Sequence, residues 1–200
     1  MIDLNYIKET IWDNWMSGGV MMIFLFSLAM FIFVVSFELL TYLRNKKLNP
    51  GNEGKWLDWA KNPDEAEGTE GVILRYTKPF VGSTDVVRRR FMELREMMLG
   101  HVERKSNFLK SLVAVAPLMG LLGTVMGMLT TFQGIASSGG NQTVDMVAKG
   151  ISTALITTQT GLMIALPGLF LNMIIRRRVR NISDAINRME GLILGQRTDN

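Results

Sequence analysis

Three long uncharged runs constrain this sequence more than any other feature. No Asp, Glu, Lys, Arg or His interrupts residues 14–37, 111–144 or 150–175. A helix needs about 20 mostly apolar residues to cross the roughly 30 Å hydrocarbon core of a bilayer. Each run is long enough, whereas the segments 44–110 and 176–200 are rich in charge. The sequence therefore predicts an all-α membrane protein with three transmembrane helices.

The second uncharged run is too long for one crossing. Its 34 residues would measure about 51 Å as a helix with a rise of 1.5 Å per residue. The small and polar residues 137–141 supply a turn. We therefore expect one helix to end near Ala136 and the next to begin around Thr143, so that the second and third spans form a hairpin.

The charged segment after the first span reads as helical. Residues Trp56 to Lys61 and Asp64 to Tyr76 have the pattern of short helices separated by Asn62-Pro63. From Asp85 onward, apolar residues recur every three or four positions, at Val87, Phe91, Leu94, Met98 and Val102. No helix breaker follows before Phe108, so this amphipathic helix is predicted to run without interruption into the second span. The helix of the third span is predicted to continue through Arg180 into the tail.

These patterns divide the chain into seven segments. The predicted segments are an external amphipathic segment (1–18), a first span (19–43), a cytoplasmic helical domain (44–107), a second span (108–136), an external loop (137–143), a third span (144–175) and a cytoplasmic tail (176–200).

The distribution of basic residues predicts the orientation of the spans. Of the 22 Lys and Arg residues, fourteen lie within residues 44–110 and six in the tail after Ile175, leaving Lys8 and Lys149 for the opposite side. Lys and Arg are retained on the cytoplasmic side of short loops. We therefore expect an external N-terminus and a cytoplasmic C-terminus. The same bias accounts for the net charge of +4 without a nucleic-acid partner.

Nothing in the sequence suggests catalysis, a cofactor or a metal site. The sequence contains no Cys, and its single histidine, His101, has no ligand-type partners at suitable spacing. The spans carry no nucleophile and base at catalytic spacing, so we predict that the protein is not an enzyme. The fifteen Met residues are interpreted as flexible packing.

The second and third spans are rich in Gly and Thr. Small residues allow helices to approach closely where lipid gives no hydrophobic drive for association. On the third span, Ala154, Thr158, Gly161 and Ala165 are expected on one stripe, and Thr153, Thr157 and Thr160 on another, roughly opposite stripe. A threonine in such a helix ordinarily donates to a carbonyl one turn back.

The segment from Ala116-Pro117 to Phe132 resembles the second-span signature of the ExbB/TolQ/MotA proton-channel family, with spaced glycines and Gly123-Thr124-Val125. Residues 150–172 are similar to the third-span motif of that family, and residues 37–44 to the end of its first span. Three spans and an external N-terminus are similar to ExbB and TolQ, since MotA-type stators have four spans. The external segment before Gly18-Gly19 is more similar to ExbB.

The resemblance implies an inner-membrane motor subunit that uses the proton motive force. It implies a homopentamer around an ExbD-like single-span partner with an intramembrane Asp, coupled through a TonB-like protein to outer-membrane transport. Residues expected on the ion pathway or facing the partner are Thr124, Thr158, Thr131, Ala154 and Gly161. Residues expected in helix packing are Pro117, Gly120, Gly123, Gly127, Pro167 and Asn172.

Several alternatives stay open. The alternatives are a TolQ-like subunit, a MotA-like or gliding-motor stator, and a purely structural membrane scaffold. The resemblance also contains a departure, because ExbB and TolQ often carry Glu where this chain has Thr153. Without that acid the titrating group must come from the partner, and the ion is either H⁺ or Na⁺.

Overall fold

The computed structural model describes residues 18–46, 48, 54–77, 81–137 and 143–198. These residues are mainly helical, and no strand occurs among them. The chain divides into two compact units. The first, here called the membrane unit, comprises Met1–Ser36 and Leu109–Leu171, and the second, here called the charged unit, comprises Phe37–Phe108 and Asn172–Asn200. The predicted segments 1–18 and 137–143 lie largely outside the described residues.

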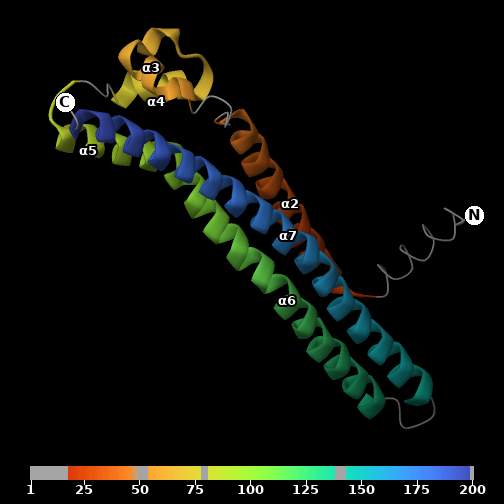
Figure 1. Ribbon diagram of the computed structural model, residues 1–200. Helices are drawn as coiled ribbons and strands as arrows, with labels where there is room; N and C mark the ends of the chain where they lie inside the picture. The colour runs from red at the N-terminus through yellow and green to blue at the C-terminus, as the bar shows by residue number, and fades with distance from the viewer. Residues whose placement is uncertain (1–17, 47, 49–53, 78–80, 138–142, 199–200) are drawn as a thin grey trace, which may run out of the picture. The chain divides into compact units, whose positions relative to one another are not determined.

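Three helices are long and apolar enough to span a membrane. They are α2 (Val20–Asn45), α6 (His101–Ser137) together with the helix that precedes it, and α7 (Thr143–Thr198) (Figure 1). This confirms the predicted all-α fold with three candidate spans. The second helix ends within one residue of the expected Ala136, and the third begins at the expected Thr143. The helix of the third span continues past Arg180 as predicted, since α7 has 56 residues.

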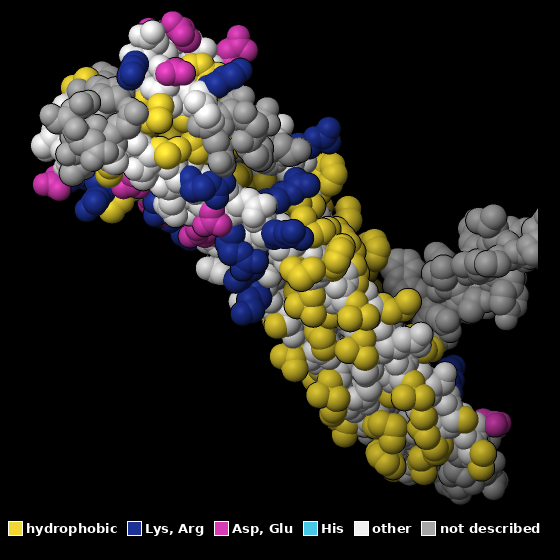
Figure 2. All heavy atoms as spheres, viewed as in Figure 1, with side chains coloured by type: hydrophobic (Ala, Val, Ile, Leu, Met, Phe, Trp, Pro, Cys, Tyr) yellow, Lys and Arg dark blue, Asp and Glu magenta, His cyan; other side chains and the backbone are white. Residues whose placement is uncertain are grey.

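The membrane unit contains the apolar parts of α2, α6 and α7. The contact between α6 and α7 in its interior is formed largely by small residues, and larger side chains such as Leu25, Ile32 and Leu109 are also buried. Its outer surface carries further large apolar side chains (Figure 2). Exposed examples are Phe24, Phe31, Leu118, Leu166 and Phe170. Such a surface is unsuited to water but matches lipid hydrocarbon.

The charged unit contains the short helices α3 (Trp56–Lys61), α4 (Gly68–Thr77) and α5 (Thr84–Arg95). It also holds parts of α2, α6 and α7, and its core is made of large apolar residues. Fully buried examples are Trp56, Ile73, Phe91, Leu99, Ile175 and Ile186.

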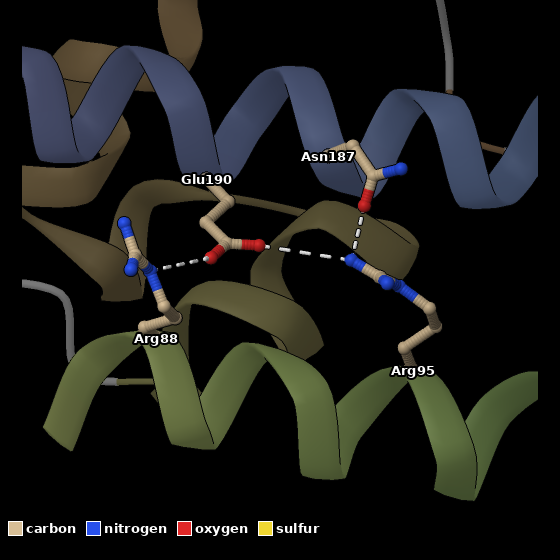
Figure 3. Close-up of polar contacts among 4 residues, drawn as sticks. All are labelled: Arg88, Arg95, Asn187 and Glu190. Atoms are coloured by element: carbon tan, nitrogen blue, oxygen red, sulfur yellow. Dashed lines mark hydrogen bonds and ion pairs between the residues drawn. The ribbon is translucent and has the colours of Figure 1, made fainter. Parts of the chain in front are cut away.

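Polar contacts at the surface of the charged unit join α5 to α7. Glu190 on α7 lies between two arginines of α5, at 4.0 Å from Arg88 Nε and 3.7 Å from Arg95 Nη2 (Figure 3). Arg95 also donates to the side chain of Asn187 (Figure 3). The predicted apolar residues of α5, Val87, Phe91 and Leu94, are buried. The ion pairs join the same helix to α7.

The expected helix from Asp64 to Tyr76 is wrong at its start. Residues Pro63–Glu65 form one 3₁₀ turn, and α4 begins only at Gly68. Gly68 has a φ of 70°, a left-handed conformation that interrupts a helix and that glycine adopts at little cost.

The predicted continuous helix from α5 into the second span is confirmed, with one irregular turn. Residues Glu96–Gly100 form a π-helical turn between α5 and α6. A π turn takes up one extra residue within a helix. Leu94 before the turn and Val102 after it are both buried.

Candidate ion pathway and helix interface

Glycines on α6 form a flat face against α7 in the membrane unit. A Cβ atom placed on Gly120 would lie 2.9 Å from the carbonyl oxygen of Thr157 and 3.0 Å from Thr158 Cα. On Gly123 it would meet the side chain of Thr157, and on Gly127 it would lie 3.4 Å from Ala154 Cβ. Of these glycines, Gly120 therefore packs most closely against the backbone of α7, and Gly127 is less tightly packed.

The facing surface of α7 is also made of small residues. Ala154, Gly161 and Ala165 are buried. A Cβ on Gly161 would lie 2.7 Å from the carbonyl oxygen of Ala116 and 3.2 Å from Gly120 Cα. Such direct contact between helix backbones is possible because both positions lack a side chain.

Thr157 also belongs to this buried face, which corrects its expected place on the opposite stripe. Its side chain is only 1% exposed. Its hydroxyl donates to the carbonyl of Ala154 at 2.8 Å and lies 3.3 Å from that of Gly120. Thr157 lies one turn from Ala154 and Gly161, so it falls at the edge of their stripe and the missing side chain at Gly123 leaves room for it.

Each hydroxyl of the predicted pathway donates to a backbone carbonyl. Thr124 donates to Leu121 at 2.6 Å and Thr131 to Gly127 at 2.8 Å, both within α6. Thr158 instead donates across the interface to Gly120 at 3.2 Å. Each hydroxyl oxygen keeps acceptor capacity, so these groups can still receive a hydrogen bond from water or from an acid.

Burial separates the five residues predicted to face the ion pathway. Thr131, Ala154 and Gly161 are buried between α6 and α7, and Thr131 is only 5% exposed. Thr124 and Thr158 are half-buried and keep part of their side chains on the surface of the chain. The partner-facing role of all five stays a prediction, and of these five residues only Thr124 and Thr158 are not fully buried within the chain.

The polar groups of this region cannot carry a proton by themselves. Residues 111–144 and 150–175 contain no ionisable side chain. Hydroxyls and carbonyls can solvate a charge or a water molecule, because their dipoles stabilise it in a region of low dielectric constant. The arrangement is therefore suited to assisting a titrating group supplied from elsewhere.

The other three residues predicted to take part in helix packing are Pro117, Pro167 and Asn172. Pro117 is half-buried in α6 and Pro167 is exposed in α7, and both helices continue through them. Asn172 is buried in the charged unit, where its side-chain oxygen accepts a hydrogen bond from Ser106 Oγ at 2.9 Å. Ser106 was not predicted, because a single serine before a span does not indicate by its sequence position which residue it contacts.

Two further glycines extend the small-residue face of α7. A Cβ on Gly150 would overlap the side chain of Thr131. On Gly168 it would lie 2.8 Å from Val113 of α6 and 3.4 Å from Ile32 of α2, so the three helices meet there. Both positions continue the spacing of Ala154, Gly161 and Ala165, and that spacing would have identified them.

Curated relatives share parts of this chain. It is 45% identical over 53 residues to Biopolymer transport protein exbB1 of Vibrio cholerae, covering 26% of this chain and 23% of the relative. It is 45% identical over 67 residues to Tol-Pal system protein TolQ of Haemophilus influenzae, covering 33% and 28%. A putative ExbB homolog of Methanothermobacter thermautotrophicus is 27% identical over 174 residues, covering 78% and 60%.

The matched segments of these three relatives thus span between a quarter and about three-fifths of their length. A family model, described as the MotA/TolQ/ExbB proton channel family, matches residues 80–188. This region exceeds half of the 200 residues and contains α5, α6, the glycine and threonine interface and most of α7. The chain therefore belongs to the MotA/TolQ/ExbB proton channel family.

Proposed function

We propose that this protein is an ExbB-like subunit of an inner-membrane, ion-driven motor complex. In this complex the proton motive force energises TonB-dependent outer-membrane transport. The observation that carries the proposal is the position of Thr124 and Thr158. Both are half-buried on acid-free spans, beside a helix interface that brings two backbones into contact. Relatives that are named biopolymer transport proteins support it.

The proposed assembly is a homopentamer around the single span of an ExbD-like partner. The partner's intramembrane Asp carries the proton, and Thr124 and Thr158 of several subunits solvate it. A charge that crosses the membrane potential releases about 2.3 kcal/mol per 100 mV. Hydroxyl groups suit this task because they lower the barrier for the charged form without binding it so tightly that movement stops.

In the proposed orientation the N-terminus is periplasmic and the charged unit is cytoplasmic. The support is the clustering of Lys and Arg in residues 44–110 and 176–200. Thr131, Ala154 and Gly161 then keep α6 and α7 rigid behind the two half-buried threonines. The protein is not proposed to act as an enzyme.

A TolQ-like role is the second candidate, because TolQ of Haemophilus influenzae matches with the same 45% identity as the Vibrio cholerae protein. The partner distinguishes the two roles. Co-purification with a TonB-like protein supports the ExbB-like role, and co-purification with a Tol-Pal component supports the TolQ-like role. A peptidoglycan-binding partner would indicate a stator.

The test is ion flux through the assembled complex. We expect Thr158→Val, co-expressed with the single-span partner and reconstituted in liposomes, to lose partner-dependent proton flux while native mass spectrometry still shows the full oligomer. The matched control is Thr160→Val, whose hydroxyl donates within α7 to Ile156 at 2.8 Å. Repeating the assay with a sodium gradient identifies the ion.

Two results would count against the proposal. Flux that survives Thr158→Val would remove the pathway role of this hydroxyl. Loss of assembly in Thr158→Val, with Thr160→Val intact, would favour a structural scaffold in which the hydroxyl bond to Gly120 holds the helices together.

A further inference from the structure

A pocket in the charged unit lies between α6 and α7, apart from the threonines of the proposed pathway. Its volume is about 280 Å³. The residues that line it are Glu103, Ser106 and Asn107 of α6 and Arg176, Val179 and Arg180 of α7. Neither the proposed motor function nor the packing of the unit accounts for two arginines in one pocket.

The two arginines of the pocket are not neutralised within the described part of the chain. Several other basic side chains of the charged unit have acidic partners, for example Lys105 with Glu38 at 2.6 Å and Arg104 with Glu96 at 3.0 Å. Arg176 and Arg180 have no ion pair with a described residue. Arg176 donates to the neutral Asn107 at 2.6 Å, and its buried Nε has no partner among the described residues.

One acidic residue, Glu103, also lines the pocket. It is exposed and makes no ion pair with a described residue. Two arginines against one glutamate leave the pocket with a net positive charge. An unneutralised guanidinium presents several N–H groups in a fixed plane, which matches the oxygens of a phosphate.

The position of the pocket along the chain gives its depth in the membrane. Arg176 is the first charged residue after the uncharged run 150–175, and Asn107 lies three residues before Lys110, the last charged residue before the run 111–144. These positions correspond to the level of the lipid headgroups, where the apolar part of a spanning helix ends. Lys and Arg side chains gather on the visible face of the charged unit (Figure 2).

We propose that this pocket binds the phosphate headgroup of an anionic phospholipid such as phosphatidylglycerol. Arg176 and Arg180 bind the phosphate oxygens, and the acyl chains remain in the bilayer beside the spans. Basic pockets between transmembrane helices are suited to acidic headgroups. Free inorganic phosphate shares the chemistry, but a lipid is already concentrated at this depth. The proposal requires the membrane location and does not depend on the motor function.

The test is a lipid titration of the purified complex in a zwitterionic detergent, followed by native mass spectrometry. We expect Arg176→Gln/Arg180→Gln to weaken phosphatidylglycerol binding by roughly 25-fold, from about fivefold for each arginine. The matched control is Arg177→Gln/Arg178→Gln, which removes the same charge from the same helix outside the pocket. It should weaken binding by much less, and phosphatidylcholine should not distinguish the variants.

A second variant keeps the test independent of folding. Glu103→Gln removes the negative charge of the pocket and should strengthen phosphatidylglycerol binding by roughly twofold to fivefold. A misfolded protein would not bind more tightly.

Equal losses in the two double variants, or no gain in Glu103→Gln, would overturn the lipid site. Displacement of the lipid by millimolar inorganic phosphate would assign the pocket to the free ion. Loss of a co-purified protein from Arg176→Gln/Arg180→Gln, with lipid binding unchanged, would assign it to a protein segment instead.

Discussion

The buried faces of α6 and α7 carry mostly small residues in the membrane unit and mostly larger apolar residues in the charged unit. In the membrane unit the contact is made by small residues such as Gly120, Ala154 and Gly161. In the charged unit the same two helices bury larger side chains such as Val102, Ile175 and Ile186. The same pair of helices therefore follows two packing rules, and the change occurs near the last apolar residues of each span.

The surrounding solvent explains this difference. Burial of apolar surface from water contributes about 25 cal/mol per Å², so large apolar side chains stabilise a unit in water. In lipid the same side chains gain little by leaving the hydrocarbon, and helices associate through close van der Waals contact. Polar groups follow the same division, since the hydroxyls of the membrane unit bond to carbonyls whereas the charged unit carries ion pairs.

The largest effect is expected from a cavity in the charged unit. Phe91→Ala should lower the free energy of unfolding by about 3–5 kcal/mol, because the fully buried ring leaves an unfilled volume. Thermal unfolding of the purified full-length protein, followed by circular dichroism, measures this change. Met92→Ala, at a neighbouring exposed position, should stay within about 0.5 kcal/mol. Similar losses in both variants would mean that the core of the charged unit does not determine its stability.

In the membrane unit, adding a methyl group should be destabilising, whereas in the charged unit the loss comes from removing a side chain. Gly120→Ala should destabilise the complex by about 1–3 kcal/mol, because the new Cβ would push against the backbone of Thr157 and Thr158. Gly127→Ala is the matched control, since its Cβ would make an ordinary contact of 3.4 Å with Ala154. Unfolding in increasing SDS compares the two variants. Tolerance of both would show that α6 and α7 do not need backbone contact.

The smallest effect is expected at the ion pairs of the charged unit. Glu190→Gln removes the acid between Arg88 and Arg95 and should cost at most about 1 kcal/mol, less at high salt. Thermal midpoints in low and high NaCl measure the loss. Glu93→Gln, at an exposed acid without an ion pair among the described residues, should change neither midpoint. A loss at Glu190 that salt does not reduce would indicate a packing role instead.

The sequence predicted the spans well because the membrane requirement is strong and local. Uncharged length and turn residues placed the end of α6 and the start of α7 within one residue. The π-helical turn at Glu96–Gly100 could not be predicted, because it depends on how α5 and α6 pack against other helices.

The sequence predicted which residue types form the candidate site, but not which of the individual side chains are buried. Periodicity placed Ala154, Gly161 and Ala165 on one face, and the structure buries all three. Thr157 was assigned to the wrong face, although its spacing of three residues from Ala154 and four from Gly161 places it at the edge of their stripe. The missing side chain at Gly123 makes room for it. Which threonines remain exposed is a property of the packed helices, so sequence alone does not separate Thr124 from Thr131.

The most direct test of the proposed pathway is cysteine accessibility in the assembled complex. The sequence contains no Cys, so Thr124→Cys and Thr158→Cys each carry a single reactive thiol. A charged, membrane-impermeant thiol reagent should label both positions in the oligomer without the single-span partner, and the partner should protect them. Leu166→Cys, on the exposed apolar surface of α7, should stay unlabelled. If both threonine positions resist the reagent as Leu166→Cys does, they face lipid, and the ion pathway is not where we propose it.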